Sequence, residues 1–499
     1  MGLPNDIVSC HRIITELASA LEAVKPQLEG YVHQINVQRD QINAQLGQLE
    51  VQRVQLERLE LRIKELESQI KQNSRNSSRP PSSDMYRKGP AFPRKKGGKI
   101  GGKKGHDGGT LKMVEVPDKV IEHKPEVCAH CGKVHAEEPL VMRGRRQVFD
   151  IPPPRLEVTE HRALNWKCGH CRHENRGGFP AWVTGPCQYG FGLQTMSVLF
   201  NNAYNIPRNK IQSIFRDLYG VTLNEGTLQS QQEFAYAQLE ADEQHIKDQL
   251  LQSQVVHFDE TGFYVEKERY WEHSASNERF TYLFVHRNRG KKAHEAGLSI
   301  LPHFKQWAIH DCLSTYFGYS DCKHGTCGSH LLRELKALIE NKSKWGAQFH
   351  AFLIDLYHQT EQGKGKLPAA KQAKALAKYK KLLQTAGQEE PPPIQGPRGK
   401  PKQTKGRNLM DRLQKRQDAV LAFAFHEEVP FTNNQAERDI RPTKTKMKVS
   451  GCFRTEYGAE IYARIQSFVS TVRKLQFNPF NELYTVLSGG IPDYRGGLC

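Results

Sequence analysis

The 499-residue sequence contains no run near the roughly 18 consecutive apolar residues that a membrane-spanning helix requires. Residues 1–17, MGLPNDIVSCHRIITEL, also lack the charged and apolar regions of a secretory signal peptide. Acidic residues are few, with 54 Asp and Glu against 72 Lys and Arg, which gives a net charge of +18. This balance argues against an ordinary metabolic enzyme. It predicts a protein that binds a polyanion, with nucleic acid as the first candidate. The missing apolar run and signal peptide predict a cytoplasmic protein.

The cysteine content does not indicate a secreted disulfide framework. The 11 Cys are an odd number spread over a long chain, and four of them form two Cys-x-x-Cys pairs. The mean hydropathy is −0.66, but 37% of the residues are hydrophobic, which is too many for a chain that is disordered throughout. The length predicts about three domains. We therefore expect several folded parts in a reducing compartment.

An apolar residue recurs at every seventh position near the N-terminus, namely at Ile35, Ile42, Leu49, Leu56, Ile63 and Ile70. This heptad series predicts a coiled coil within a helical region at residues 1–72, and self-association as a homodimer or larger oligomer. A single amphipathic helix that lies on another domain is the alternative. A shorter helix over residues 6–24 precedes the heptads, and we expect Pro26 to separate the two helices.

The next segment is polar and strongly basic. NSRNSSRPPSSD, residues 73–84, begins a flexible linker that we place at residues 73–113. Residues 71–112 hold 12 Lys and Arg against two Asp, so +10 of the total charge lies there. Lysine interleaved with glycine cannot build a core, but it can contact DNA phosphates. The expected contacts are Arg94, Lys95, Lys96, Lys99, Lys103 and Lys104. A solvated linker without a ligand is the alternative.

Two Cys-x-x-Cys turns indicate a small zinc-binding β module at residues 114–186. The ligands would be Cys128, Cys131, Cys168 and Cys171. Two such turns supply the four thiolates of a closed tetrahedral structural zinc site. The segments RRQVFDI and RLEVTEHRAL between the pairs resemble strands, and a long hairpin would have to bring the turns together. Two unrelated redox or free-thiol turns are the alternative.

Residues 187–250 read as a helical connector that contacts DNA. Ile211, Ile214, Phe215 and Leu218 follow helical spacing, and Gly220 ends that helix. Thr222 and Glu225 predict a capping box for the next helix. The outline fits a helix-turn-helix, while an ordinary αα-hairpin is at least as compatible with the acidic second helix.

From residue 251 the pattern changes to short β-rich runs, which predict an α/β domain at residues 251–475. Three strands are expected in SQVVHFDETGFYV, RYWEHSA and RFTYLFVH, then a helix in KKAHEAGLSILPHF and a fourth strand in QWAIHDCLSTYF. A mostly helical insertion follows at about residues 341–428. Residues 476–499 are expected to form a C-terminal tail.

Three carboxylates in this domain point to metal-dependent chemistry. Asp259 and Asp311 each end an apolar run that reads as a strand, and Glu437 lies in NNQAERDIRP, where Asn433 or Asn434 would cap a helix. Basic residues follow Glu437, and the DNA contacts expected there are Arg438, Arg441, Lys444 and Lys446. Three acids from distant segments suit two hard divalent ions, Mg²⁺ or Mn²⁺, in phosphodiester transfer.

Taken together, these segments resemble the insertion-sequence-66 (IS66) family of DDE transposases over nearly the whole chain. The matching pieces are the heptad region, NSRNSSRPPSSD, the Gly/Lys linker, the paired Cys-x-x-Cys unit, HFDET, the HD strand, CGSHLLREL, and NNQAERDIRP with GAEIYARIQSF. Asp311 is followed by CLSTY, where the family has a Gly/Tyr-rich segment. Cys322, Cys327 and His330 could be read as a second metal site, but packing explains them better because a fourth ligand is missing.

The resemblance implies a multidomain α+β protein with an RNase H-like catalytic domain that a helical insertion interrupts. It places the catalytic, magnesium-binding triad at Asp259, Asp311 and Glu437. The implied activity is cleavage of double-stranded DNA at element ends and strand transfer into target DNA. The implied protein is associated with the nucleoid when bound to DNA, and accessory proteins of the same element are possible partners. A non-catalytic, zinc-containing DNA-binding protein with a degenerate nuclease fold is the alternative.

Overall fold

The computed structural model describes residues 6–70, 111–134, 141–363, 365–392 and 403–496. The chain divides into two compact units. The first comprises residues 1–87, 330–358 and 369–417, and the second comprises residues 88–329, 359–368 and 418–499. Within the described ranges, no helix is both long and apolar enough to cross a membrane.

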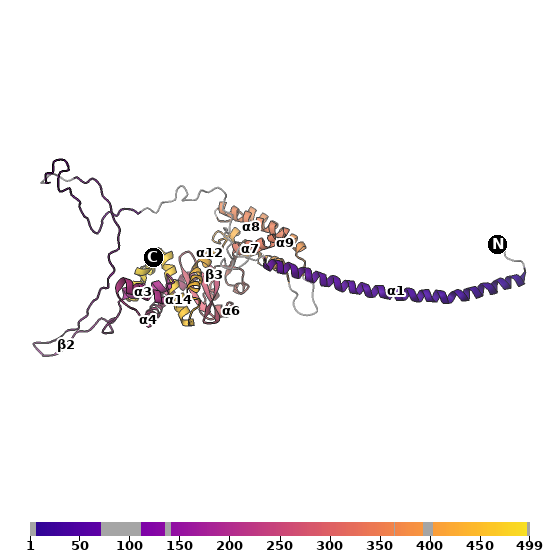
Figure 1. Cartoon of the computed structure of the whole chain (residues 1–499), viewed down its shortest axis with the longest axis horizontal. Coiled ribbons are helices and arrows are strands. Elements are labelled where there is room, and N and C mark those ends of the chain that lie inside the picture. The colour runs from indigo at the N-terminus through magenta and orange to yellow at the C-terminus, as the bar shows by residue number, and fades with distance from the viewer. Residues whose placement is uncertain (1–5, 71–110, 135–140, 364, 393–402, 497–499) are drawn as a thin grey trace. The chain divides into compact units, whose positions relative to one another are not determined.

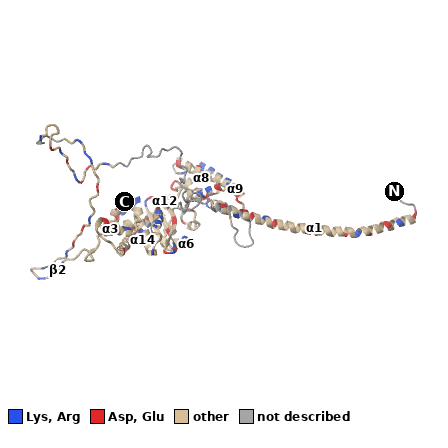
Figure 2. Cartoon of the chain, in the orientation of Figure 1, with Lys and Arg blue, Asp and Glu red and all other residues tan. Residues whose placement is uncertain are grey.

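The first unit begins with one continuous helix, α1 (Ile7–Ile70), which contains Pro26. The expectation that Pro26 separates two helices is therefore wrong, because strong helix formers on both sides continue the helix past a single lost hydrogen bond. Acidic and basic side chains alternate along α1 (Figure 2), and Arg53 pairs with Glu50 and Glu57 one turn away on either side. The heptad residues of the series are exposed, Ile35 by 61% and Leu49 by 59%.

The rest of the first unit is helical. Its elements are α7 (Gly328–Glu340), α8 (Lys344–Gln362), α9 (Ala369–Glu389) and α10 (Lys405–Lys415), of which the ends of α7 and α8 extend into the second unit. The Phe349 ring on α8 meets the Tyr379 ring on α9 edge to face at 5.0 Å between centroids. The Tyr379 hydroxyl donates to the carbonyl of Leu413 on α10 at 2.9 Å. These contacts tie α8, α9 and α10 into one bundle, in the segment where the sequence predicts helices.

The second unit, in which Figure 1 labels β3 and α14, is built on a five-stranded sheet. The strand order is β5-β4-β3-β6-β7. The strands are β3 (Val255–Val265), β4 (Glu268–Ser276), β5 (Thr281–His286), β6 (Trp307–His310) and β7 (Lys323–Thr326). Strands β3, β4 and β5 are antiparallel neighbours, and β6 and β7 run parallel to β3.

The four strands that the sequence predicts are confirmed, and β7 is an addition. The helix expected in KKAHEAGLSILPHF is wrong as one element. That segment forms only the short α6 (Lys291–His294) and a 3-10 turn over Leu301–His303. Gly297, with φ at +76°, and Pro302 break the helix between and within these pieces.

Helices α5, α12, α13 and α14 contact the sheet. The helices of this part of the chain are α2 (Phe191–Asn202), α3 (Arg208–Tyr219), α4 (Glu225–Gln238), α5 (Glu240–Leu251), α11 (Gln417–Phe425), α12 (Asn434–Asp439), α13 (Arg441–Ser450), α14 (Glu456–Lys474), α15 (Pro479–Leu487) and α16 (Asp493–Gly496). Helix α14 packs on β5, where the Ser467 hydroxyl accepts the amide of Leu283 at 2.8 Å. The expected C-terminal tail is folded, because Leu483 and Tyr494 are fully buried against α2, α4 and α14.

The helical region before the sheet agrees with the sequence in its outline and differs at one cap. Gly220 ends α3 in the left-handed conformation at φ +68°, as expected. The capping box of Thr222 and Glu225 is wrong, because Asn224 caps α4 by accepting the amide of Thr227 at 2.7 Å. Asn is a strong N-cap residue, and it stands next to the first helical position.

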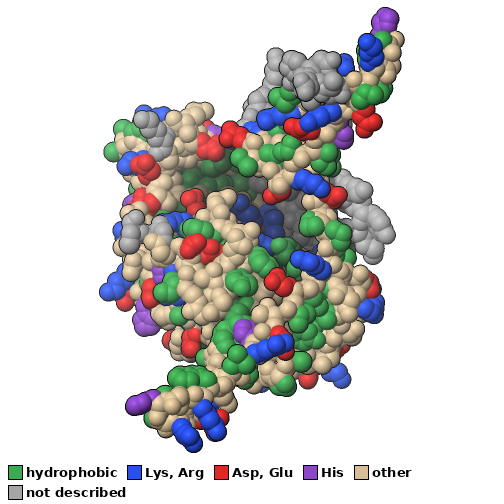
Figure 3. Space-filling model, turned by 90° about the vertical axis from the view of Figure 1, so that its left-hand side faces the viewer, with side chains coloured by type: hydrophobic (Ala, Val, Ile, Leu, Met, Phe, Trp, Pro, Cys, Tyr) green, Lys and Arg blue, Asp and Glu red, His purple; other side chains and the backbone are tan. Residues whose placement is uncertain are grey.

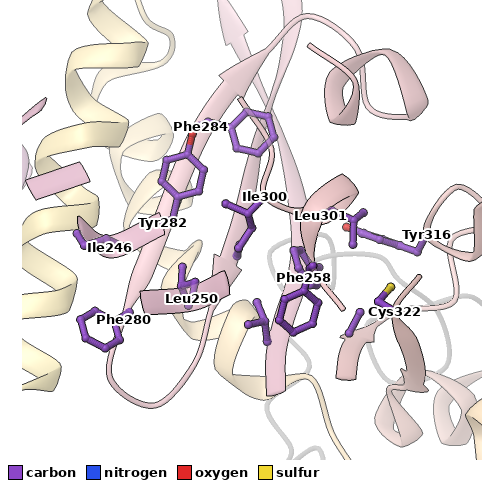
Figure 4. Close-up of a cluster of buried hydrophobic side chains, with 14 residues drawn as sticks. Ile246, Leu250, Phe258, Phe280, Tyr282, Phe284, Ile300, Leu301, Tyr316 and Cys322 are labelled. Atoms are coloured by element: carbon purple, nitrogen blue, oxygen red, sulfur yellow. The ribbon is translucent and has the colours of Figure 1, made fainter. Parts of the chain in front are cut away.

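The main core lies between the sheet and the helices that follow β5 and precede β3. Phe258 on β3 meets Phe304 and Tyr316 with ring centroids 5.9 and 6.2 Å apart (Figure 4). Tyr282 and Phe284 of β5 and Ile246 and Leu250 of α5 complete this cluster (Figure 4). The core therefore fixes the part of β3 that carries Asp259.

Glu272 on β4 is a carboxylate without solvent access, and it makes stability depend on pH. It is 1% exposed, and the Thr443 hydroxyl donates to it at 2.7 Å. Burial raises its pKa to about 8. The folded state therefore favours the protonated acid. Its stabilising contribution is full below the ordinary pKa near 4.5 and is lost as the pH rises through 8.

We expect Glu272→Gln to raise the free energy of unfolding by about 3 kcal/mol at pH 8 and to change it little at pH 5. The amide keeps the shape of the neutral acid and cannot ionise. Denaturant unfolding at both pH values measures the effect. Glu268→Gln is the matched control on the same strand, because the Glu268 side chain is 57% exposed. Equal effects of Glu272→Gln at both pH values would contradict the assignment.

Candidate active site

Asp259 lies where β3 loses one of its two neighbouring strands. Strand β3 pairs with β6 only from Val255 to His257, whereas its pairing with β4 continues to Val265. The expectation that the strand ends at Asp259 is wrong, because the antiparallel partner continues β3 for six residues beyond it. Asp259 still sits just past the end of the parallel pairing, where the sheet opens and a side chain can reach a ligand.

Asp311 follows β6 directly, in a tight turn. Its Oδ1 accepts the amide of Leu313 at 2.9 Å, and the amide of Cys312 donates to Nδ1 of His310 at 3.2 Å. Cys312 has a φ of +74°, a conformation that favours glycine. The turn therefore needs the backbone geometry that a Gly-rich continuation would supply, and this chain adopts it with a cysteine.

Glu437 lies on α12, and Asn433 fastens that helix to β3. Asn433 is fully buried and makes no side-chain cap to its own helix. Its Nδ2 donates to the carbonyl of Phe258 at 2.8 Å, and its Oδ1 lies 2.8 Å from Nδ1 of His257. The oxygen is an acceptor, so His257 donates from Nδ1. Burial lowers the pKa of His257 to about 4, which keeps the ring neutral.

This link between Asn433 and His257 is absent from the sequence-based expectations, which considered Asn433 only as a helix cap. The available signal was that a polar residue precedes each of these acids, His257 before Asp259 and Asn433 before Glu437. Because His257 is two residues from Asp259, the link ties the position of α12 to that of the first acid.

The three carboxylates interact electrostatically. Burial, the neighbouring Glu260, and the charges of Asp311 and Glu437 raise the pKa of Asp259 to about 8. Asp259, Asp311 and Glu437 are each partly buried. Asp311 and Glu437 therefore lie near enough to Asp259 to raise its pKa, but ligand oxygens of these three acids do not all lie within 4.8 Å of one another. Carboxylates that repel one another at the edge of a sheet are a donor set that fits divalent cations, which relieve this repulsion.

A fourth acid, Glu260, follows Asp259 on β3 and is held by two partners. Its Oε1 accepts Nε of Arg289 at 2.7 Å, and its Oε2 accepts the Tyr316 hydroxyl at 2.6 Å. A terminal nitrogen of Arg289 lies 3.8 Å from Oδ2 of Asp311. Burial and the charge of Asp311 raise the pKa of Glu260, and its two donors oppose this shift. Neither Glu260 nor Arg289 was among the expected site residues.

Asp439, the last residue of α12, pairs with Lys474 of α14. Lys474 donates to Oδ2 of Asp439 at 2.8 Å and to Thr281 at 2.6 Å, so that α12, α14 and β5 share one ammonium group. Of the four cations expected to bind DNA here, Arg438, Arg441 and Lys444 are exposed, whereas Lys446 is 8% exposed. Lys446 lies 3.3 Å from the carbonyl of Asn201, and burial lowers its pKa to about 8.

The two Cys-x-x-Cys turns have the same backbone geometry. In each turn, the amide of the first cysteine donates to the carbonyl of the residue five positions on. Cys128 donates to Lys133 at 2.8 Å, and Cys168 donates to His173 at 2.9 Å. The residue after each pair, Gly132 and Arg172, has a positive φ. Backbone hydrogen bonds from the second cysteine of each pair lower the pKa of Cys128 and of Cys168. Each turn therefore favours a thiolate, the form that binds zinc.

The structure does not bring the four sulfur atoms together, since the described residues contain no group of three of these ligands within 4.8 Å. The strands expected in RRQVFDI and RLEVTEHRAL are also absent from the described residues. Val148 and Val158 in these segments are 91% and 88% exposed, so no packing holds them as strands. Among the described residues of this module, β1 (Asn165–Lys167) and β2 (Glu174–Arg176) pair around the second turn, and Val127 and Val134 form an isolated antiparallel bridge around the first.

Cys322 and Cys327 are buried and have partners in the second unit. Burial raises the pKa of Cys322 to about 11, which disfavours a metal-binding thiolate. Sγ of Cys327 accepts the amide of Asn433 at 3.2 Å. Burial therefore supports a packing role for Cys322, whereas Sγ of Cys327 is one of three ligand atoms that lie within 4.8 Å of one another and could hold a metal ion. The cationic residues Arg94, Lys95, Lys96, Lys99, Lys103 and Lys104 lie outside the described residues.

Comparison with known protein families identifies the family of this chain. The sequence profile of the transposase IS66 family matches residues 187–461, more than half of the chain, and includes all three acids. The zinc-finger binding domain of transposase IS66 matches residues 125–172, with all four paired cysteines. A family of unknown function matches residues 29–112. No curated protein matches the chain. The chain belongs to the IS66 transposase family and contains its zinc-finger domain.

Proposed function

We propose that this transposase cuts DNA at the ends of a mobile element and joins them to target DNA with Asp259, Asp311 and Glu437 as its catalytic acids. The observation that carries the proposal is the electrostatic convergence of these three carboxylates from β3, the turn after β6, and α12. A sheet of three antiparallel strands continued by two parallel ones supports an RNase H-like catalytic domain.

The chain's own residues position the reaction. Asp259, Asp311 and Glu437 would hold two Mg²⁺ ions, which activate a nucleophile and stabilise the leaving oxygen. Asn433 keeps α12, and with it Glu437, at a fixed place relative to β3. The turn hydrogen bond from Leu313 fixes the orientation of the Asp311 carboxylate. Phosphoryl transfer needs this positioning and charge compensation, and it needs no protein nucleophile.

The test incubates the full-length protein with Mg²⁺ or Mn²⁺ and a labelled duplex that carries the element's own terminus. We expect nicked strands first and strand-joined products when target DNA is added. Binding without either product, at saturating protein and metal, would contradict catalysis and support a protein that only binds DNA.

DNA binding by the basic segment is a second part of the proposal. On the face that Figure 3 shows, Lys and Arg side chains are interspersed with Asp and Glu. The densest positive charge in the sequence is the +10 of residues 71–112. A cationic segment contributes sequence-independent affinity through counterion release.

Deletion of residues 71–112 should therefore weaken binding to all duplexes and flatten the dependence of affinity on salt. Titrations by fluorescence anisotropy over a range of salt concentrations measure both effects. A control chain in which a neutral Gly/Ser segment of equal length replaces these residues separates charge from spacing. An unchanged salt slope in that control would show that the segment is only a spacer.

We further propose that α1 pairs with α1 of a second copy. The heptad side chains of the described helix are exposed along its length, as with Leu56 at 61% and Ile63 at 55%. A continuous apolar stripe at heptad spacing is buried by a partner helix in a coiled coil. Such a homodimer would hold two element ends at a raised effective concentration.

A further inference from the structure

Arg289 occupies a distinctive position beside the three acids. It follows β5, and its guanidinium lies between the fully buried carboxylate of Glu260, at 2.7 Å, and Asp311, at 3.8 Å. The Arg289 side chain is 43% exposed, while that of Glu260 is 0% exposed. One end of this ion pair is therefore inside the protein, and the other reaches solvent at the edge of the site.

Three contacts fix the orientation of the guanidinium. Nε donates to Glu260, whose other oxygen is held by the buried Tyr316 hydroxyl. The Trp271 ring of β4 lies 5.0 Å from the guanidinium carbon, a cation–π distance. Glu260 and Trp271 come from two adjacent strands of the sheet, so the arginine is oriented by rigid elements.

The terminal nitrogens remain available for a ligand. Within the part of the chain that the structure describes, Arg289 donates one hydrogen bond, from Nε, and its contact with Asp311 is too long for a second. A guanidinium presents paired donors that match the oxygens of a phosphate group. In an ordinary structural ion pair, the terminal nitrogens of Arg289 would donate to the Glu260 carboxylate. Here only Nε donates to Glu260, and a terminal nitrogen lies on the side of Asp311.

We propose that Arg289 is a further catalytic residue that donates to a non-bridging oxygen of the scissile phosphate, and that Glu260 and Trp271 are its positioning residues. The inference rests on the proposed function, because the phosphate is the one whose cleavage the three acids would promote. A cation at this place offsets the negative charge that develops on the phosphate during transfer.

The first test measures binding without cleavage, with Ca²⁺ in place of Mg²⁺, by anisotropy on a duplex that carries the element's terminus. We expect Arg289→Ala to weaken binding about tenfold, as the loss of one charge-assisted hydrogen bond predicts. The loss should disappear on a duplex with a methylphosphonate at the scissile position. Arg287→Ala is the matched control, since Arg287 is 64% exposed and pairs with Glu268.

The second test measures single-turnover cleavage with saturating Mg²⁺. We expect Arg289→Ala to be about 10² to 10³-fold slower than wild type and Arg287→Ala to be unchanged. Arg289→Lys keeps the charge but lacks the paired donors, so it should recover only part of the rate. Glu260→Gln alone should slow cleavage. In combination with Arg289→Ala it should cause no further loss of rate, because Glu260 acts through Arg289.

The outcomes separate this inference from the proposed function. Two results would overturn the inference about Arg289. One is an equal loss of affinity of Arg289→Ala for the phosphate and the methylphosphonate duplex, and the other is cleavage at the wild-type rate by a folded Arg289→Ala variant. In both cases, cleavage by the wild-type protein would still uphold the proposed function. If Arg289→Ala does not fold, full activity of Arg289→Lys would overturn the inference. A wild-type protein that binds with the expected phosphate dependence but never cleaves would retain the contact and refute the function.

Discussion

Replacement of Asp259 by Asn should reduce cleavage at the element end by at least about 10³-fold, since it removes one of three acids that act as a unit. The side chains have the same shape, so the sheet should be unchanged. Binding of DNA should remain or become slightly tighter, because a negative charge next to the phosphate is lost. Single-turnover cleavage and anisotropy measure the two effects. Asp248→Asn, at an exposed position on α5, is the control.

The pKa of Asp259 adds a pH signature to this variant. The folded-state value of about 8 lies above the ordinary value of 3.8, so without metal the site loses stability as the pH rises through 8. Asp259→Asn should therefore raise the thermal midpoint of the metal-free protein at pH 8 and not at pH 4. Protons compete with cations, so Mg²⁺ should stabilise wild type more at pH 8 than at pH 6. A parallel loss of folding and cleavage would contradict a catalytic role.

Removal of zinc should abolish the ordered structure of residues 114–186 while the sheet domain stays folded. Apolar side chains there are exposed, with Val127 at 53% and Trp166 at 61%, so no core replaces the metal. Apparent binding free energies of about 10 to 16 kcal/mol are typical of structural zinc sites. Such a value is large compared with the stability of a small module. We expect one zinc per chain with all four cysteines as ligands.

Limited proteolysis before and after chelation, together with metal analysis under reducing conditions, tests this expectation. Cys128→Ser and Cys168→Ser should each mimic chelation, because each removes one ligand of a closed tetrahedral site. Cys187→Ser is the control, since Cys187 is an exposed thiol outside both pairs. Zinc retained at full stoichiometry in Cys168→Ser would show that the two turns do not share one ion.

The sequence predicted the strands next to Asp259 and Asp311 because each contains a mostly apolar run, VVHF in β3 and WAIH in β6, that is typical of a buried strand. It did not predict β7, whose four residues, KHGT, contain a glycine and no apolar alternation. It also missed Arg289, because nothing local indicates that this arginine meets Glu260 across 29 residues of chain. The sequence predicted Asn433 as a possible helix cap, because it cannot show that the Phe258 carbonyl and the His257 ring of β3 lie within hydrogen-bonding distance of the Asn433 side chain.

The length of α1 has a geometric consequence for the proposed pairing. At 64 residues the helix is about 96 Å long, which equals about 28 base pairs of duplex. If two copies pair in parallel, their basic linkers leave the coiled coil at the same end, and two catalytic domains can act on neighbouring phosphates. An antiparallel pair would instead set the linkers nearly three helical turns of DNA apart. Helix polarity would then decide whether the two ends of an element are cut in one assembly or at separate places.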